Sequence, residues 1–167
     1  MIWATAGGVT VGLAILIHFV IAWYPGKKPL LKRPLDHVGR LLPFVFGWAY
    51  GALGTLTVMG LIGWAFDTAL WAANWLGDAV LWLGVGESPG QISHGAVQPL
   101  TAVGNFTVVL LTAAVIALIK YRPSGSEIKK GVLSGLCLGT SAGVAGLTAV
   151  PLANAVNALG TVVYGNV

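Results

Sequence analysis

The sequence predicts an all-α, polytopic integral membrane protein, with four transmembrane helices and one Trp-rich interfacial or re-entrant helix on the outer side. Three observations predict this class. Hydrophobic residues make up 56% of the 167 residues and charged residues only 8%, against roughly 45–50% and 25% in soluble domains. Four apolar runs reach the length of about 20 residues that a helix needs to cross a bilayer. All nine Lys and Arg residues lie in two short segments.

The predicted spans belong to a single membrane domain, residues 1–167, and cover residues 2–24, 41–66, 100–119 and 131–153. The first run contains no charge and is long enough to cross with some tilt. It also lacks the basic region and the small-residue cleavage site of a signal peptide, so we expect it to be retained. Before the second run, Pro34 and Asp36 are typical of a helix start.

The basic residues determine the expected orientation. The two basic segments hold Lys27, Lys28, Lys32, Arg33 and Arg40, and then Lys120, Arg122, Lys129 and Lys130. The positive-inside rule places both segments in the cytoplasm, so the chain must cross the membrane an even number of times between them. The second and third spans supply these crossings. We therefore expect both termini on the extracytoplasmic side of a bacterial cytoplasmic membrane.

A fifth apolar stretch, which we interpret as an outer helix over about residues 68–84, carries Asp78 in its middle. A crossing here would expel one basic segment and place this carboxylate near mid-bilayer, at about 2.5–3.5 kcal/mol. At 100° per residue, four indole rings share one side of the helix: Trp64, Trp71, Trp75 and Trp82. The favoured interpretation of this interfacial platform is an aromatic belt. The alternative is an acidic and aromatic surface for a cation, a lipid headgroup or a partner chain.

The fourth span is rich in small residues at helical spacing. The candidate interface comprises Gly131, Gly135, Gly139, Gly143 and Gly146 with Ala142 and Ala149. Small residues let helix backbones approach closely, which provides much of the association energy of helices in lipid. The sequence leaves open whether this face contacts another helix of the same chain or a second copy in a homo-oligomer.

Three polar side chains fall within predicted spans, namely His18, Asn105 and Asn154. Interhelical hydrogen bonds, typically worth about 0.6 kcal/mol, are the favoured role, and a polar lining for ions or a solute is the alternative. The basic segments chiefly determine topology. They could also attract anionic lipid, at about 1 kcal/mol per basic residue. No motif or aromatic interleaving points to nucleic acid.

The sequence contains no motif for catalysis or metal binding, and Cys137 is its single cysteine. We therefore expect no enzymatic activity, cofactor or metal. The favoured function is an oligomeric membrane protein that forms a pore or the membrane component of a larger assembly. The alternatives are a small carrier or channel subunit, and a membrane anchor that recruits anionic lipid, DNA or a cytosolic protein. In length and composition the chain resembles holins and the small membrane proteins of bacterial conjugation and phage systems, a likeness that involves no motif.

Overall fold

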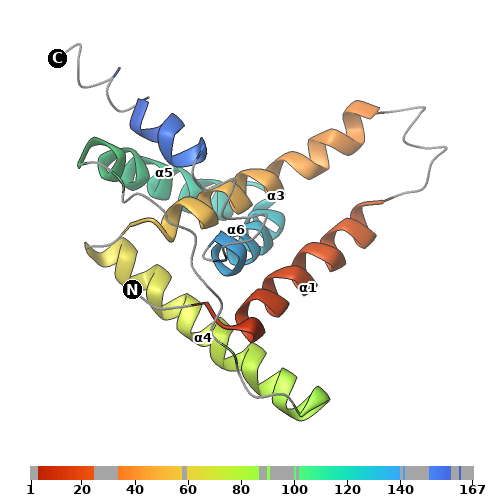
Figure 1. The fold of residues 1–167 in the computed structure, drawn as a ribbon. Helices are drawn as coiled ribbons and strands as arrows, with labels where there is room; N and C mark the ends of the chain where they lie inside the picture. The colour runs from red at the N-terminus through yellow and green to blue at the C-terminus, as the bar shows by residue number, and fades with distance from the viewer. Residues whose placement is uncertain are drawn as a thin grey trace.

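The computed structural model of the chain describes residues 4–24, 34–57, 60–86, 90, 100, 102–139, 141, 151–158 and 162. Over these residues the fold is all-α, as the sequence predicts (Figure 1). The labelled helices are α1 (Ala6–Trp23), α3 (Pro34–Gly54), α4 (Gly60–Val85), α5 (Ala102–Tyr121) and α6 (Gly125–Gly139). A further helical segment covers residues 151–158.

Two of the described helices are long and apolar enough to cross a membrane, over Ala6–Trp23 and Gly104–Tyr121. They correspond to the first and third predicted spans. In α3 the apolar part is shorter, Leu41–Gly54. The 15 residues of α6 extend about 22 Å, whereas the hydrocarbon core is about 30 Å thick. The described residues thus hold two full-length candidate spans where the sequence predicts four.

The second predicted span, 41–66, is divided between two helices, so the prediction of one continuous helix is wrong. The hydroxyl groups of Thr55 and Thr57 donate to the carbonyl oxygens of Ala52 and Gly54, at 2.7 and 2.6 Å, where α3 ends. Such bonds compete with the backbone hydrogen bonds that would continue a helix. At the start of α4, Gly60 has a φ of +86°, which glycine adopts without a Cβ clash. Hydropathy alone does not register these features.

The fourth predicted span, 131–153, also differs from the structure, because α6 ends at Gly139. Just beyond it, the backbone N–H and the hydroxyl of Ser141 both donate to the carbonyl oxygen of Leu138, at 3.1 and 2.8 Å, and form a turn. Residues 142–150 lie outside the described part of the chain. The described helical residues resume at Pro151.

Helices α3 and α6 run parallel and in close contact. Gly131 of α6 lies against Phe44 of α3, and one turn later in both helices Gly135 lies against Trp48. Nine of the 15 residues of α6 are buried, and this helix contacts each of the other four labelled helices. The short, glycine-rich α6 is therefore the central element of the fold.

Helices α1 and α5 run opposite to this central pair. Ser134 of α6 donates to the carbonyl oxygen of Gly12 in α1 at 3.0 Å. Two turns later in α1, Phe19 stacks on Phe44 of α3 with ring centroids 3.8 Å apart. Tyr50 of α3 donates to Thr112 of α5 at 2.8 Å. Further along α3, Leu53 packs in a cluster with Val108, which precedes Thr112. Thus α1 and α5 share one direction, and α3 and α6 share the opposite one.

Helix α4 runs across the direction of α1 and α3 instead of alongside them (Figure 1). Near its start, Phe66 meets the ring of Tyr50 edge-on, with centroids 5.6 Å apart. In its second half, Gly77 touches Gly7 at the start of α1. The predicted outer helix, 68–84, is therefore part of a longer helix that joins the end of α3 to the beginning of α1.

Candidate functional site

The predicted small-residue face of α6 contacts α3 of the same chain. We call this contact the glycine seam, and its residues are Gly47 and Gly51 of α3 with Gly131, Gly135 and Gly139 of α6. A Cβ added at Gly131 or Gly135 would overlap the carbonyl oxygen of Phe44 or Trp48. The backbones can therefore approach this closely only with glycine at these positions.

The seam contains two glycines that the sequence reasoning missed. A Cβ added at Gly47 would overlap the carbonyl oxygen of Ile128, and one at Gly51 that of Val132. Their four-residue spacing is a G-x-x-x-G signal, which could have identified α3 as the partner helix. The other small residues of the predicted interface lie outside the described residues, namely Ala142, Gly143, Gly146 and Ala149.

A second close contact joins the N-terminus of α1 to the middle of α4, and we call it the α1–α4 joint. Each of the first three N–H groups of α1 donates to a different acceptor: Ala6 to the carbonyl oxygen of Gly90, Gly7 to Asp78 Oδ1 and Gly8 to Thr5 Oγ1, at 3.0, 3.2 and 3.2 Å. These are the groups that a helix leaves unpaired. The buried Asn74 adds a bond, since its Oδ1 accepts from Thr5 N at 3.3 Å.

The carboxylate of Asp78 therefore acts as a cap on α1. A negative charge at a helix N-terminus is stabilised by the partial positive charge there, by about 0.3–1 kcal/mol at exposed positions. The alternative interpretation of the platform places this residue beside the Trp rings in a surface for a cation, a lipid headgroup or a partner chain. Instead, its oxygen binds the backbone of another helix, 71 residues away in sequence.

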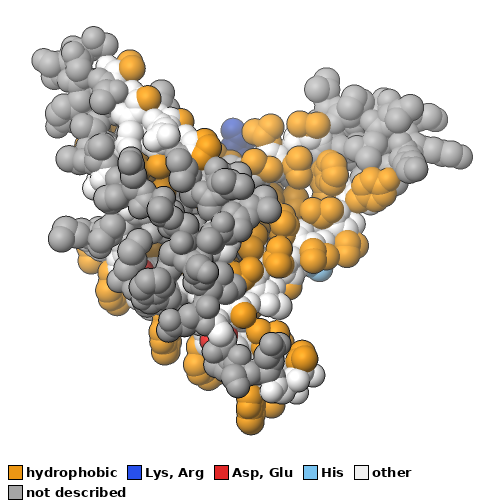
Figure 2. Space-filling view, in the orientation of Figure 1, with side chains coloured by type: hydrophobic (Ala, Val, Ile, Leu, Met, Phe, Trp, Pro, Cys, Tyr) orange, Lys and Arg blue, Asp and Glu red, His pale blue; other side chains and the backbone are white. Residues whose placement is uncertain are grey.

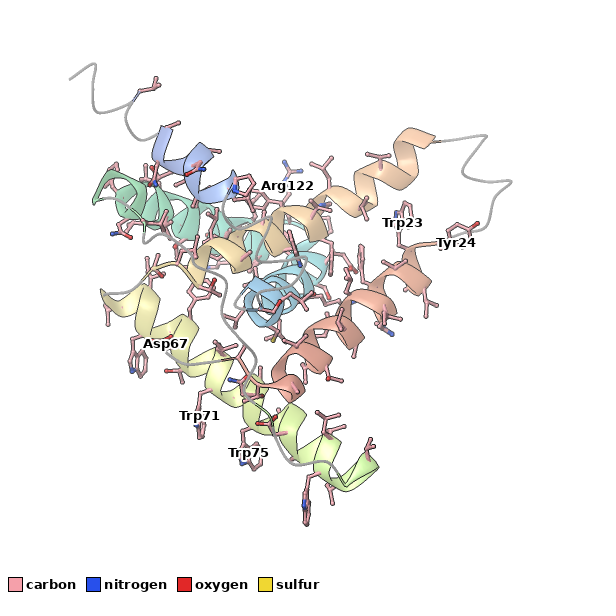
Figure 3. The ribbon with its side chains drawn as sticks, viewed as in Figure 1. Trp23, Tyr24, Asp67, Trp71, Trp75 and Arg122 are labelled. Atoms are coloured by element: carbon pink, nitrogen blue, oxygen red, sulfur yellow. The ribbon has the colours of Figure 1, made fainter. Side chains whose placement is uncertain are left out.

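The four Trp side chains of the predicted platform do share one face of α4. They are 59–69% exposed, and Figure 3 shows Trp71 and Trp75 pointing away from the other helices. On the opposite side Leu70, Ala73 and Gly77 are buried. This face thus offers indole rings to the surroundings while its neighbouring carboxylate, Asp78, is bonded to α1. The arrangement fits an aromatic belt better than a cation site.

The side of α4 opposite to the Trp rings is aliphatic and is buried only in part. Leu70 and Ala73 lie against the bundle, but Leu76, Val80 and Leu83 are exposed. The reason is visible in Figure 1, where the C-terminal end of α4 extends beyond its crossing with α1. The end of α4 is therefore apolar on several sides.

The three polar residues predicted within spans share no buried site. The side chains of His18, Asn105 and Asn154 are all exposed. His18 lies in the second half of α1, whereas Asn105 lies in the first turn of α5, and these helices are parallel. The described residues thus provide no common lining built from these side chains, which the carrier hypothesis requires.

The described cations gather where α5 ends and α6 begins. They are Lys120, Arg122, Lys129 and Lys130, and Figure 3 labels Arg122. Lys130 Nζ lies 3.5 Å from Glu127 Oε1 in a partly exposed pair, which contributes little stability. Lys120 Nζ lies 5.3 Å from the centroid of the Tyr121 ring. Residues 27–33 and the side chain of Arg40 lie outside the described part.

The same end of the bundle contains a hollow of about 280 Å³ between α1, α3 and the turn that joins α5 to α6. Phe19, Trp23 and Pro43 line one side, and Glu127 and Lys130 the other. Among the described residues, no three His, Cys, Asp or Glu side chains are grouped so as to hold a metal ion. Comparison with protein-family models, with curated proteins and with solved structures finds no match to this chain.

The cap on α1 gives a testable prediction. We expect Asp78→Ala to lower the free energy of unfolding in detergent by about 1 kcal/mol, because the Gly7 amide loses its acceptor and the helix loses a favourable charge. Asp78→Asn keeps an acceptor oxygen and should cost less. Denaturant titration followed by circular dichroism measures both. Thr68→Ala, an exposed change on the same helix, is the control, and equal stability of Asp78→Ala and the wild type would contradict the capping role.

Proposed function

We propose that this chain is a non-enzymatic integral membrane protein that serves as the membrane component of a larger assembly. The observation that carries the proposal is the apolar surface of the two helices long enough to cross a bilayer. On α1, Ile17 and Ile21 are 55% and 70% exposed, and on α5, Ile116 is 61% exposed. Figure 2 likewise has hydrophobic side chains along much of the visible surface of α1 and α4. Such a surface is unfavourable in water, at about 25 cal/mol per Å², but not in lipid.

In the proposed topology the basic segments lie in the cytoplasm and α4 lies at the outer surface. The opposite directions of α1 and α5 relative to α3 and α6 support this arrangement. The four described cations at the α5–α6 turn then share the inner end of the bundle. The Trp face and Asp78 lie at the other end, at the level where indole rings are favoured.

The centre of the monomer is filled by packed helices. This favours a role in assembly over a path for ions or a solute through the monomer. The central helix α6 is packed against α3 through glycine backbones, and Leu136 and Cys137 beside them are almost fully buried. The polar residues that a carrier would use are instead exposed on the outside. The apolar C-terminal end of α4, which extends past α1, provides a surface for a further membrane subunit or a second copy.

Membrane integration and sidedness can be tested together. We expect the protein to stay in the membrane fraction after alkaline carbonate extraction. In a Cys137→Ser background, Leu83→Cys should react with a membrane-impermeant maleimide on intact cells, whereas Ser126→Cys should react only after permeabilisation. Both residues are exposed, so access depends on sidedness. Release by carbonate, or labelling of both sites from one side, would overturn the proposal.

The assembly role has its own measurement. Native mass spectrometry after extraction in a mild detergent should give particles larger than the 17.2 kDa chain, composed of several copies or of this chain with other membrane subunits. A particle that contains one chain alone, under conditions that keep known membrane complexes intact, would contradict the role in assembly while leaving membrane integration in place.

A further inference from the structure

An apolar groove of about 380 Å³ lies on the surface between α4, α5 and α6. Hydrophobic side chains line its length: Val115, Ile116 and Ile119 from α5, and Val132, Leu133 and Leu136 from α6. The volume falls within the range of about 300–1,000 Å³ that is usual for small-molecule sites. Its walls offer an apolar ligand contact and almost no hydrogen-bonding groups.

The two ends of the groove differ in chemistry. At one end lies Lys129, in the second turn of α6, together with Ile119 at the end of α5. At the other end Phe66 and Ala69 of α4 form the wall. The groove therefore leads from the cationic turn of the bundle to the transverse helix, and from Lys129 to Leu136 it follows α6 for about 10 Å.

We propose that this groove binds one acyl chain of an anionic phospholipid of the cytoplasmic leaflet, with the phosphate of the headgroup at Lys129. The inference rests on the proposed function, because it requires the α5–α6 turn to lie at the inner membrane surface. The apolar walls match the hydrocarbon chain. The cation at the other end matches the headgroup, since anionic lipids attract basic residues at the membrane surface.

Charge selects this occupant over a second copy of the chain. At this end the described side chains include four cations and one carboxylate, Glu127, which lies beside Lys130. Among the side chains that the structure describes, the other acidic ones are Asp67 and Asp78, and both belong to α4. A lipid phosphate would bring a negative charge to Lys129, whereas the described side chains at the α5–α6 turn of a second copy are mostly cations.

The headgroup contact is tested by native mass spectrometry of the delipidated full chain, titrated with phosphatidylglycerol or with phosphatidylcholine of the same acyl chains. We expect phosphatidylglycerol to bind more tightly. Lys129→Gln should weaken its binding about fivefold, the effect of one basic residue near an anionic headgroup, and should leave phosphatidylcholine unaffected. The matched control is Lys130→Gln, because this neighbour lines the hollow on the other side of α6. Equal binding of the two lipids, or equal losses in the two variants, would overturn the proposal.

The acyl-chain contact is tested with a second matched pair. Ile116→Trp fills the groove and should reduce the binding of both lipids, whereas Leu110→Trp, on the same helix and similarly exposed, lies outside the groove and should change neither. If both variants bind lipid like the wild type, the groove is not the site. Efficient disulfide cross-linking of Ile116→Cys between copies, in a Cys137→Ser background and with phosphatidylglycerol present, would assign the groove to a second copy.

Carbonate extraction of every variant separates this inference from the proposed function. A chain that resists extraction but shows no dependence of lipid binding on Lys129 leaves membrane integration intact and overturns the groove proposal alone. A chain that carbonate releases overturns both.

Discussion

Gly135→Ala is expected to lower the free energy of unfolding by about 3 kcal/mol, at the upper end of the usual range for overpacked cores. The added methyl group would overlap the carbonyl oxygen of Trp48. Neither helix can move away easily, because α6 is held between α3 and α1, where Ser134 bonds to Gly12. In an exposed helix the same substitution stabilises by about 1 kcal/mol. The seam therefore reverses the sign of the usual glycine-to-alanine effect.

The single cysteine of the chain provides the measurement. Cys137 is fully buried next to the seam, so a thiol-reactive fluorescent dye in detergent reports its exposure during a thermal ramp. We expect Gly135→Ala to lower the midpoint of the transition markedly. Gly84→Ala is the matched control, since an added Cβ there meets no atom within 4 Å, and its midpoint should be unchanged or raised. Midpoints for Gly135→Ala at or above that of the wild type would show that the seam is not closed.

The sequence predicts well those helices that correspond to an apolar run with a clear boundary. The span of α5 is an apolar run that ends at Lys120 and Arg122, and α1 is an uncharged run. The Trp face of α4 was also predictable, because it depends only on the angle between successive residues of a helix. In each of these cases a local pattern along the chain determines the outcome.

The breaks in the second and fourth spans were not predictable from hydropathy, which measures the preference for lipid and not the continuity of the backbone. Thr55 and Thr57 are tolerated in apolar helices, yet here their hydroxyl groups bind carbonyl oxygens at the end of α3. Similarly, the glycines of α6 indicate that some backbone approaches closely, but not which one. The four-residue spacing of Gly47 and Gly51 was the available signal for α3.

The role of Asp78 illustrates a different limit. On the sequence, this carboxylate belongs to a surface stripe with the Trp rings. In the structure it caps a helix that begins at Ala6, far away along the chain. Only the crossing of α1 and α4 reveals that partner, and the crossing depends on Gly7 and Gly77, whose backbones touch. A polar residue in an apolar helix can therefore serve to orient a neighbouring helix instead of binding a ligand.

This crossing leads to the second large expected effect. Gly77→Leu should separate α4 from α1, because even a Cβ at this position would overlap the carbonyl oxygen of Gly7. The bonds from Thr5 and Gly7 to Asn74 and Asp78 would break together, since all of them depend on the same approach. Hydrogen exchange measured by mass spectrometry should then be at least about tenfold faster in residues 4–12, which corresponds to about 1.4 kcal/mol of lost local stability.

The central helix should respond differently. Amides of residues 131–139 are protected by the glycine seam with α3, which Gly77→Leu leaves unchanged, so their exchange should stay within about twofold of the wild type. Gly84→Leu places the same side chain on the same helix where the added Cβ meets no atom within 4 Å, and should leave both regions unchanged. Equal loss of protection in residues 4–12 and 131–139 would show that α4 is part of one cooperative core with α6. Because α4 meets the rest of the fold chiefly at α1, we expect instead that it detaches while the seam stays closed.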